Sequence, residues 1–209
     1  MPEIRGVLFD YGLVLSGPPE ASAWKRMREV LKAEEADFHA AYWRPRHDYD
    51  RGALSGVGYW GVVARDLGRT LEDRELLELL EADVQLWTQP NQAMIGWAAA
   101  LQRAGVPTGV LSNLGDAMEE GILRCCPWLA DFQHHTFSHR LRIAKPEAAI
   151  YRHAVEGMGL PAREVLFIDD REDNILAARE EGLQAVRYED HGRFLAELRE
   201  LEVRGIPLP

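Results

Sequence analysis

Short hydrophobic runs alternate with amphipathic stretches along most of the chain, and this alternation predicts its secondary structure. The hydrophobic runs indicate five strands, which lie just before Asp10 and at 106–112, 132–137, 164–169 and 184–188. Helical spacing of apolar residues predicts helices at 94–104, 113–125, 147–158, 174–181 and 191–201. Pro146 suits the first turn of the third of these helices. Strands that alternate with helices imply an α/β fold with a parallel sheet and helices on both faces.

A different pattern separates the first strand from the others. From 20 to 86 the apolar residues recur at helical spacing, and no run typical of a strand interrupts them. The turn-forming residues 16–19 mark where this segment begins. We therefore predict an all-helical insert at 16–87, set into a core domain that is formed by 1–15 and 88–209.

Composition and charge limit the classes of partner. The 209 residues are 46% hydrophobic and 28% charged, an ordinary globular mix with enough apolar material for a core. The net charge of −10 disfavours binding to nucleic acid or to anionic membranes, although a local positive site or a metal could still hold a phosphate. No segment approaches the roughly 18 apolar residues of a membrane span. Cys125 and Cys126 lack metal-ligand spacing and the first residues do not resemble a secretory signal, which together favour a cytoplasmic location.

Polar side chains follow three of the predicted strands. Asp10 ends the first strand, Ser112 and Asn113 follow the second, and the pair Asp169-Asp170 follows the fourth. Ligands of open parallel sheets bind beyond the carboxyl ends of the strands. We therefore expect these side chains to meet in one crevice.

These groups suit a divalent cation and a phosphate. The carboxylates of Asp10 and Asp170, with a backbone carbonyl near Gly12, supply the oxygen ligands that Mg²⁺ prefers. Gly12 is also expected to let the backbone turn sharply and approach a ligand. Ser112 could hold phosphate oxygens at a helix N-terminus, and Lys145 would neutralise their charge. Taken singly, a Ser-Asn pair is more often a helix cap and a Lys-Pro pair is usually on the surface, but the ordered set is much more specific.

Four segments resemble the sequence motifs of the haloacid dehalogenase-like (HAD) hydrolase superfamily: Phe9–Val14, Leu111–Asn113, Ala144–Pro146 and Phe167–Asn174. The match spans nearly the whole chain, since the helical insert falls where that superfamily places a cap domain. The segment 51–55, followed by Tyr59 and Trp60, also resembles this cap. The resemblance implies a Rossmann-like core with the first strand central, and a mobile cap over the strand ends.

The resemblance also implies roles for the candidate residues. Asp10 would be the nucleophile, and Lys145 would be a second catalytic residue that orients the transferring group. Ser112 and Asn113 would bind that group. The implied reaction is attack by Asp10 on phosphorus, formation of an aspartyl-phosphate intermediate, and hydrolysis of this intermediate by water.

The implied cofactor is Mg²⁺, which would neutralise the charge that develops during the reaction. Its expected ligands are Asp10, the carbonyl of Gly12, Asp170 and, directly or through a water, Asp169. Asn174 or Asp173 is expected to support the site by holding Lys145 or the metal-bound waters.

Two positions depart from the superfamily pattern. Most of its phosphatases carry a second aspartate two residues after the nucleophile, as a general acid and base, and this chain has Gly12 there. General acid–base help is typically worth about 10²–10⁴-fold, so either the rate is lower or another group takes the role. His47, Asp48 and Tyr49 of the cap are candidates for it. The second departure is Arg142, where a glycine is common.

The first motif, Asp-x-Gly-x-Val, most resembles that of sugar-phosphate phosphatases, which favours a Mg²⁺-dependent phosphatase of small phosphorylated metabolites. The alternatives are a metal-independent 2-haloacid dehalogenase and a non-catalytic binding or regulatory protein. Adjacent Asp169 and Asp170 repel each other unless a cation is near, which favours the phosphatase. Substrate contacts are expected from the cap, although each of these residues alone is more often an ordinary surface residue. The residues concerned are Arg46 and His47, with Arg44 and Arg51 as further candidates.

Overall fold

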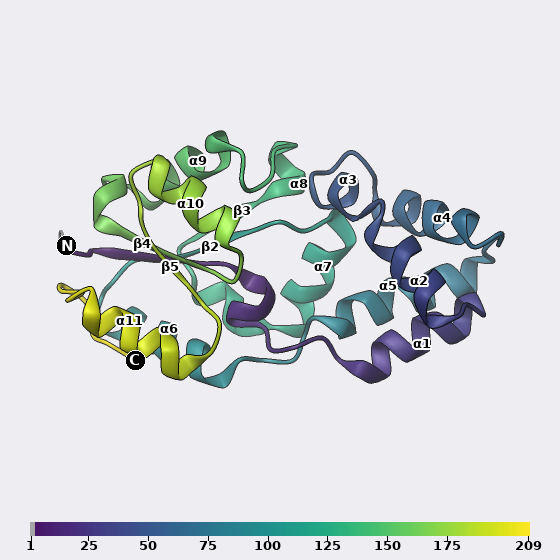
Figure 1. The fold of residues 1–209 in the computed structure, drawn as a ribbon, viewed down its shortest axis with the longest axis horizontal. Coiled ribbons are helices and arrows are strands. Elements are labelled where there is room, and N and C mark those ends of the chain that lie inside the picture. The colour runs from purple at the N-terminus through teal and green to yellow at the C-terminus, as the bar shows by residue number, and fades with distance from the viewer. Residues whose placement is uncertain (1–2) are drawn as a thin grey trace.

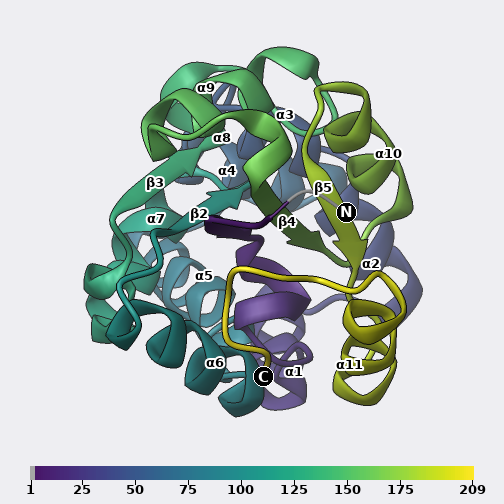
Figure 2. The same ribbon diagram turned by 90° about the vertical axis from the view of Figure 1, so that its left-hand side faces the viewer.

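The computed structural model describes residues 3–209 and contains, within this range, a five-stranded parallel sheet in the order β3-β2-β1-β4-β5 (Figures 1 and 2). The strands are β1 Gly6–Phe9, β2 Thr108–Ser112, β3 His134–Phe137, β4 Val165–Asp169 and β5 Gln184–Arg187. The central strand β1 pairs on both sides, with Leu8 opposite Gly109 of β2 and Phe167 of β4. The predicted Rossmann-like α/β class with the first strand central is confirmed.

Helices cover both faces of the sheet (Figure 2). On one face lie α9 Ala148–Met158 and α10 Glu172–Glu180, and on the other lie α6 Gln92–Arg103 and α11 His191–Glu200. Successive side chains of β1 enter the two layers in turn. Leu8 packs in the cluster that contains Tyr151, whereas the Phe9 ring meets Trp97 with ring centroids 5.5 Å apart. Burial on both faces explains why the strands are continuous apolar runs.

The larger differences from the predicted boundaries occur near the strand ends. Helix α7 (Asp116–Cys125) begins at Asp116 rather than at 113, because the preceding residues form a loop against Lys145. The short helix α8 (Ser138–Leu141) has no counterpart in the prediction. Pro146 lies before Glu147, the N-cap of α9, and is therefore outside the first helical turn where it was expected.

The segment between β1 and α6 is helical. It contains α1 Ala21–Leu31, α2 Glu35–Trp43, α3 Arg46–Asp50, α4 Gly56–Asp66 and α5 Asp73–Leu86. Glu72 and Glu75 form a reciprocal capping box at the start of α5. No strand lies among these described residues, as the prediction of an all-helical cap requires. The boundaries of the two domains stay a prediction, although Ser16 and Pro90 pair where the chain leaves and re-enters the core.

None of the helices within residues 3–209 combines the length and apolar character that crossing a bilayer requires. The cap helices lie beyond the carboxyl ends of the strands (Figure 1). Helix α5 packs against α7, and the turn after α3 approaches α8 so closely that a Cβ at Gly52 would lie 2.5 Å from the carbonyl oxygen of His139. Beside it, Arg51 Nη2 donates to the carbonyl of Arg142 over 3.2 Å. These contacts bring the end of α3 to the loop that carries Lys145.

The backbone of Arg142 explains why a glycine is common at this position. Arg142 follows α8 in the left-handed conformation, with φ 57° and ψ 26°. Glycine adopts this conformation without strain, whereas another residue adopts it at a cost of about 1–2 kcal/mol. The departure from the motif therefore lowers stability.

Replacing Gly52 with alanine is expected to destabilise the protein more than the same change at Gly68. Both glycines have positive φ, +75° and +68°, so each variant carries a left-handed penalty of about 1–2 kcal/mol. At Gly52 the new Cβ also meets the backbone of His139, which adds about 1–3 kcal/mol, whereas at Gly68 it meets no atom within 4 Å. Urea unfolding measures both losses. Equal losses would mean that the Gly52 turn can move away from α8 at no cost.

Candidate active site

Asp10 follows β1 directly and begins the tight turn Tyr11–Leu15. Its Oδ1 accepts from the backbone N–H of Tyr11 over 2.7 Å, which orients the carboxylate at the sheet edge. Leu13 has the left-handed conformation, with φ 57°, whereas Gly12 has φ −63° and ψ 130°, which any residue can adopt. The turn therefore does not need the glycine expected for it. A Cβ at Gly12 would meet no atom within 4 Å, so this position has room for a side chain.

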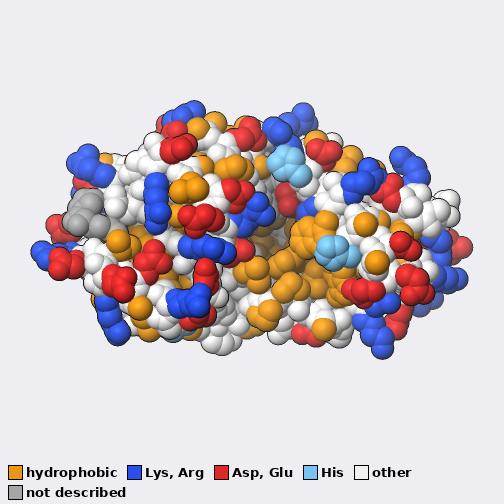
Figure 3. Space-filling model, viewed as in Figure 1, with side chains coloured by type: hydrophobic (Ala, Val, Ile, Leu, Met, Phe, Trp, Pro, Cys, Tyr) orange, Lys and Arg blue, Asp and Glu red, His pale blue; other side chains and the backbone are white. Residues whose placement is uncertain are grey.

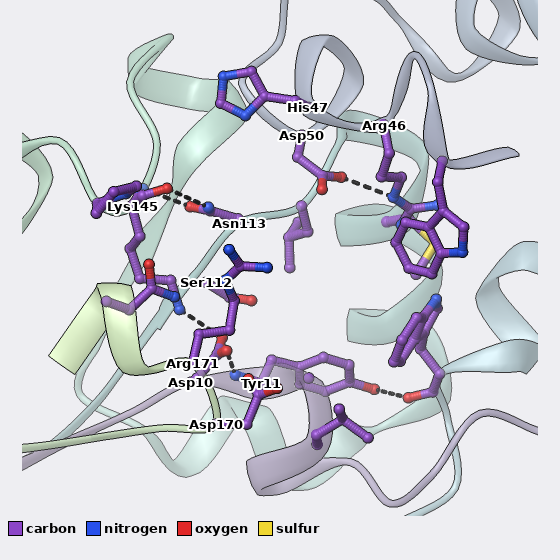
Figure 4. A pocket seen from close by; sticks show the side chains of 18 residues that line it. Asp10, Tyr11, Arg46, His47, Asp50, Ser112, Asn113, Lys145, Asp170 and Arg171 are labelled. Atoms are coloured by element: carbon purple, nitrogen blue, oxygen red, sulfur yellow. Dashed lines mark hydrogen bonds and ion pairs between the residues drawn. The ribbon is translucent and has the colours of Figure 1, made fainter. Parts of the chain in front are cut away.

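Lys145 joins the ends of three strands (Figure 4). Its buried Nζ lies 2.9 Å from Asp10 Oδ1 and 2.6 Å from Asp169 Oδ2, and it donates to the carbonyl of Leu111 over 3.0 Å. Asn113 holds the Lys145 backbone from both sides. Its Nδ2 donates to the Lys145 carbonyl and its Oδ1 accepts from the Lys145 N–H, each over 2.9 Å. Asn113 thus positions Lys145, and its expected contact with the substrate stays a prediction.

Asp169 is surrounded by protein donors. Besides Lys145, Asn174 Nδ2 donates to both carboxylate oxygens over 2.9 and 3.0 Å, and the Arg171 N–H donates to Oδ1 over 2.9 Å. Asp173 instead pairs with the side chain of Arg171 over 2.6 Å and is partly exposed. Of the two expected supporting residues, Asn174 lines the cavity described below and Asp173 does not. Asn174 acts on Lys145 through Asp169 rather than by direct contact.

The acidic cluster fits a divalent cation. Asp10, Asp169 and Asp170 each offer a carboxylate oxygen, and these oxygens all lie within 4.8 Å of one another. Three carboxylates around the single ammonium of Lys145 leave the cluster with net negative charge, and the nearby Arg171 is itself paired with Asp173. Asn174 Oδ1 is buried without a partner in the described part of the chain, and a water on a bound ion could supply the missing donor. Oxygen ligands and retained waters are what Mg²⁺ requires.

The pKa shifts within the cluster also favour a bound cation. Burial raises the pKa of Asp10 to about 7 and outweighs the opposing effect of Lys145, while Asp169 and Asp170 add repulsion. Burial also raises the pKa of Asp170, with Asp169 as the next cause. Burial lowers the pKa of Lys145, but Asp10 and Asp169 outweigh it and leave the pKa raised, so this ammonium keeps its charge at neutral pH. A bound cation would favour the ionised form of the carboxyl groups.

A cavity of about 500 Å³ opens between the strand ends and the cap (Figures 3 and 4). Its polar floor is formed by Asp10, Ser112, Asn113, Lys145, Asp170 and Asn174. A second side, the apolar wall, is formed by Tyr11, Leu13, Trp43, Trp87, Leu114 and Met118. Hydrophobic side chains accordingly gather around the hollow in Figure 3. The cavity can therefore take a phosphate at its floor and an organic group against the wall.

Arg46 also lines this cavity but is largely committed to the cap. Its Nη1 lies 3.1 Å from both oxygens of Asp83 and 2.7 Å from the hydroxyl of Tyr42, and its Nε donates to Asp50 Oδ1 over 3.1 Å. The expected contact of Arg46 with the substrate stays a prediction. The present contacts make it a residue that positions Asp50.

The other expected cap residues differ in their access to the cavity. His47 is exposed and lies at the cavity rim. Arg44 and Arg51 pair with acidic residues elsewhere and do not line the cavity. Of the candidates for the missing acid and base, Asp48 does not line it either, and Tyr49 is buried with its hydroxyl accepting from a backbone N–H of α7.

Sequence reasoning missed Asp50, Trp43 and Trp87, which all line the cavity. For Asp50 a signal was present, because residues four apart on a helix share a face and Arg46 and Asp50 have this spacing. For the two tryptophans no local signal distinguishes a cavity wall from an ordinary core position.

Charged and polar side chains that line a cavity at the carboxyl ends of a parallel sheet, beneath helices of an inserted segment, are typical of an α/β enzyme. Residues 3–182 match the family model described as haloacid dehalogenase-like hydrolase. The chain belongs to this family and is a hydrolase, as the sequence motifs predicted.

Relatives of both reaction types occur among the similar proteins, since putative phosphatase YhcW of Bacillus subtilis is 21% identical over 96% of this chain and 94% of its own length. (S)-2-haloacid dehalogenase 1 of Pseudomonas sp. is 27% identical over 90% of this chain and 85% of its own length. Haloacid dehalogenase-like hydrolase domain-containing protein 3 of Danio rerio is 30% identical over 65% of this chain, and the match spans 61% of that relative. A HAD family enzyme of Bacteroides thetaiotaomicron has the same fold, with a TM-score of 0.76, 20% identity, and coverage of 92% of this chain and 98% of that one.

Replacing Lys145 with methionine is expected to destabilise the metal-free protein by about 3–5 kcal/mol, because Asp10 and Asp169 lose their buried counter-charge. Adding Asp169→Asn to the same chain removes one of the uncompensated charges and should recover part of this loss. Urea unfolding in EDTA compares the two variants with the unsubstituted protein. A double variant less stable than the single one would contradict the role of Lys145 as a counter-charge.

Proposed function

We propose that this hydrolase is a Mg²⁺-dependent phosphatase of small phosphorylated metabolites, with Asp10 as its nucleophile. The observation that carries the proposal is the cluster of Asp10, Asp169 and Asp170 around a single lysine. A metal-independent reaction would leave this cluster with uncompensated charge in a buried site. A divalent cation balances that charge and brings phosphate oxygens to the same point.

The chain's own residues account for the remaining steps. The Asp10 carboxylate attacks phosphorus and becomes an aspartyl phosphate, which water then hydrolyses. Lys145, held by Asn113, keeps the carboxylate and the phosphoryl group in register, and the hydroxyl of Ser112 at the end of β2 faces the same cavity. Mg²⁺, held by Asp10, Asp170 and the Gly12 carbonyl, would neutralise charge on the phosphoryl oxygens.

The cavity supports a small organic phosphate as the substrate. Its volume of about 500 Å³ suits a metabolite, and the apolar wall can pack against a sugar ring or another compact group. A HAD family enzyme of Bacteroides thetaiotaomicron with this fold has been solved in complex with magnesium and inorganic phosphate, which supports the choice of cofactor and group. A cytoplasmic location and the lack of nucleic-acid or membrane partners remain part of the proposal.

Dehalogenation of a 2-haloacid is the second candidate. Its support is the similarity to (S)-2-haloacid dehalogenase 1 over 90% of this chain, together with the absence of a carboxylate at Gly12. Asp10 would then attack carbon instead of phosphorus, and no metal would be needed. Asp170 weighs against this candidate, because Lys145 pairs with Asp10 and Asp169 and no ion pair among the described residues balances the third carboxylate.

We expect release of p-nitrophenol from p-nitrophenyl phosphate in the presence of Mg²⁺, and we expect EDTA to abolish it. In Asp10→Asn the rate should fall by at least about 10³-fold, because the amide cannot act as the covalent nucleophile. Binding of Mg²⁺ by calorimetry provides a second readout, and Asp170→Asn should weaken it. Release of chloride from 2-chloropropionate in EDTA, without phosphatase turnover, would favour the dehalogenase. Mg²⁺ binding without turnover of either compound would indicate a binding protein.

A further inference from the structure

The cavity contains one carboxyl group that the proposed reaction has not used. Its lining includes three aspartates, of which Asp10 and Asp170 belong to the acidic cluster on the floor. The third, Asp50, comes from the cap and faces the floor from the opposite side (Figure 4). A proton donor for the leaving group is also what the chain lacks at Gly12.

Asp50 is held in place from two directions. It is the last residue of α3, and Arg46 Nε donates to its Oδ1 over 3.1 Å, while Arg46 is itself fixed by Asp83. Its backbone carbonyl accepts a hydrogen bond from Ser138 Oγ, at the start of α8 in the core. The side chain is 18% exposed, so it is mostly buried yet open to the cavity. Asp50 is therefore a rigidly mounted carboxyl group that a bound substrate can reach.

The surroundings of Asp50 suit proton exchange near neutrality. Burial raises its pKa to about 7, Arg46 opposes this rise, and Asp83 of α5 adds to it. Lys145 also lowers the pKa, which places the Asp50 carboxyl within the electrostatic reach of the catalytic lysine. Besides Arg46 and the floor residues, the cavity lining contains the charged Arg171 and the titratable Tyr11, and the titratable His47 lies at the rim. A carboxyl group in this range can both give and take a proton during turnover.

We infer that Asp50 is the general acid and base of this hydrolase, supplied by the cap in place of a carboxylate at Gly12. This inference rests on the proposed phosphatase function. The three neighbours considered from sequence fit less well: Asp48 does not line the cavity, the Tyr49 hydroxyl is engaged with α7, and His47 is at the exposed rim.

The proton balance is simple. As an Asp10 oxygen bonds to phosphorus and the bond to the ester oxygen breaks, protonated Asp50 gives its proton to that oxygen and an alcohol leaves. A water molecule then bonds to phosphorus as the bond to Asp10 breaks, and its proton goes to the Asp50 carboxylate. Inorganic phosphate leaves, and both aspartates return to their starting states.

The test compares Asp50→Asn on two esters of similar shape, phenyl phosphate and p-nitrophenyl phosphate. We expect kcat/KM for phenyl phosphate to fall by about 10²–10⁴-fold, because its leaving oxygen needs a proton. The loss for p-nitrophenyl phosphate should be much smaller, since nitrophenolate leaves without one. Slow hydrolysis of the aspartyl phosphate should then give a burst of nitrophenol close to one equivalent of enzyme. If Asp50 had a merely structural role, the substitution would lower kcat/KM for both esters alike and give no burst of nitrophenol.

The pH profile gives an independent readout. A general acid must be protonated, so kcat/KM of the unsubstituted enzyme for phenyl phosphate should fall as pH rises through about 7, the pKa of Asp50. In Asp50→Asn this alkaline decline should disappear. If Asp50→Asn does not fold, the pH profile of the unsubstituted enzyme still tests the inference. A value of kcat/KM for phenyl phosphate that does not decline above neutral pH would overturn it.

Two further variants make the test specific. Asp48→Asn removes a carboxyl group from the same helix but outside the cavity, and should leave both rates unchanged. Gly12→Asp, for which the structure has room, should restore phenyl phosphate turnover in the Asp50→Asn background. Normal activity of Asp50→Asn on both esters would overturn the role of Asp50 and leave the phosphatase standing. No phosphatase turnover by the unsubstituted enzyme would overturn both.

Discussion

The buried ammonium of Lys145 is the interaction on which the site depends. It lies between Asp10 and Asp169 and also donates to β2, so it ties the ends of β1, β2 and β4 to one point. Burying three ionisable groups is costly unless each has partners, and here the Tyr11 N–H donates to Asp10, the Leu111 carbonyl accepts from Lys145, and Asn174 donates to Asp169. Since the lysine holds both carboxylates at fixed distances, the same contact builds the proposed nucleophile and the proposed metal site.

A second constraint is the junction between the cap and the core. The close approach of Gly52 to α8 and the contact of Arg51 with the Arg142 carbonyl hold the end of α3 over the strand ends. The cap therefore does more than cover the cavity, because it brings a carboxyl group into it. On our inference for Asp50, the cap supplies the proton-transferring acid that the core lacks at Gly12.

Sequence patterns predicted the core closely because its information is local. Strands buried on both faces must be apolar runs, and carboxyl groups placed just after them must lie at one edge of a parallel sheet. The convergence of Asp10 and Asp169 followed from this reasoning alone, whereas Lys145 was expected there from its place before a helix and from the motif that it resembles. The prediction was less accurate for backbone conformation. The left-handed residue of the first turn is Leu13 and not Gly12, and the side chain of Arg142 does not indicate that its backbone is left-handed.

By itself, then, the sequence determined the fold class, the order of the motifs and the acidic cluster, because periodicity and strand-end chemistry are properties of neighbouring residues. Tertiary structure alone decided which cap residues face the cavity. Asp48, Tyr49 and Asp50 are consecutive polar residues, yet only the packing of α3 against α5, α7 and α8 turns Asp50 inward. Tertiary structure likewise decided whether Asn174 or Asp173 supports the site. Asn174 lies on the side of α10 that meets Asp169, whereas Asp173 pairs with Arg171.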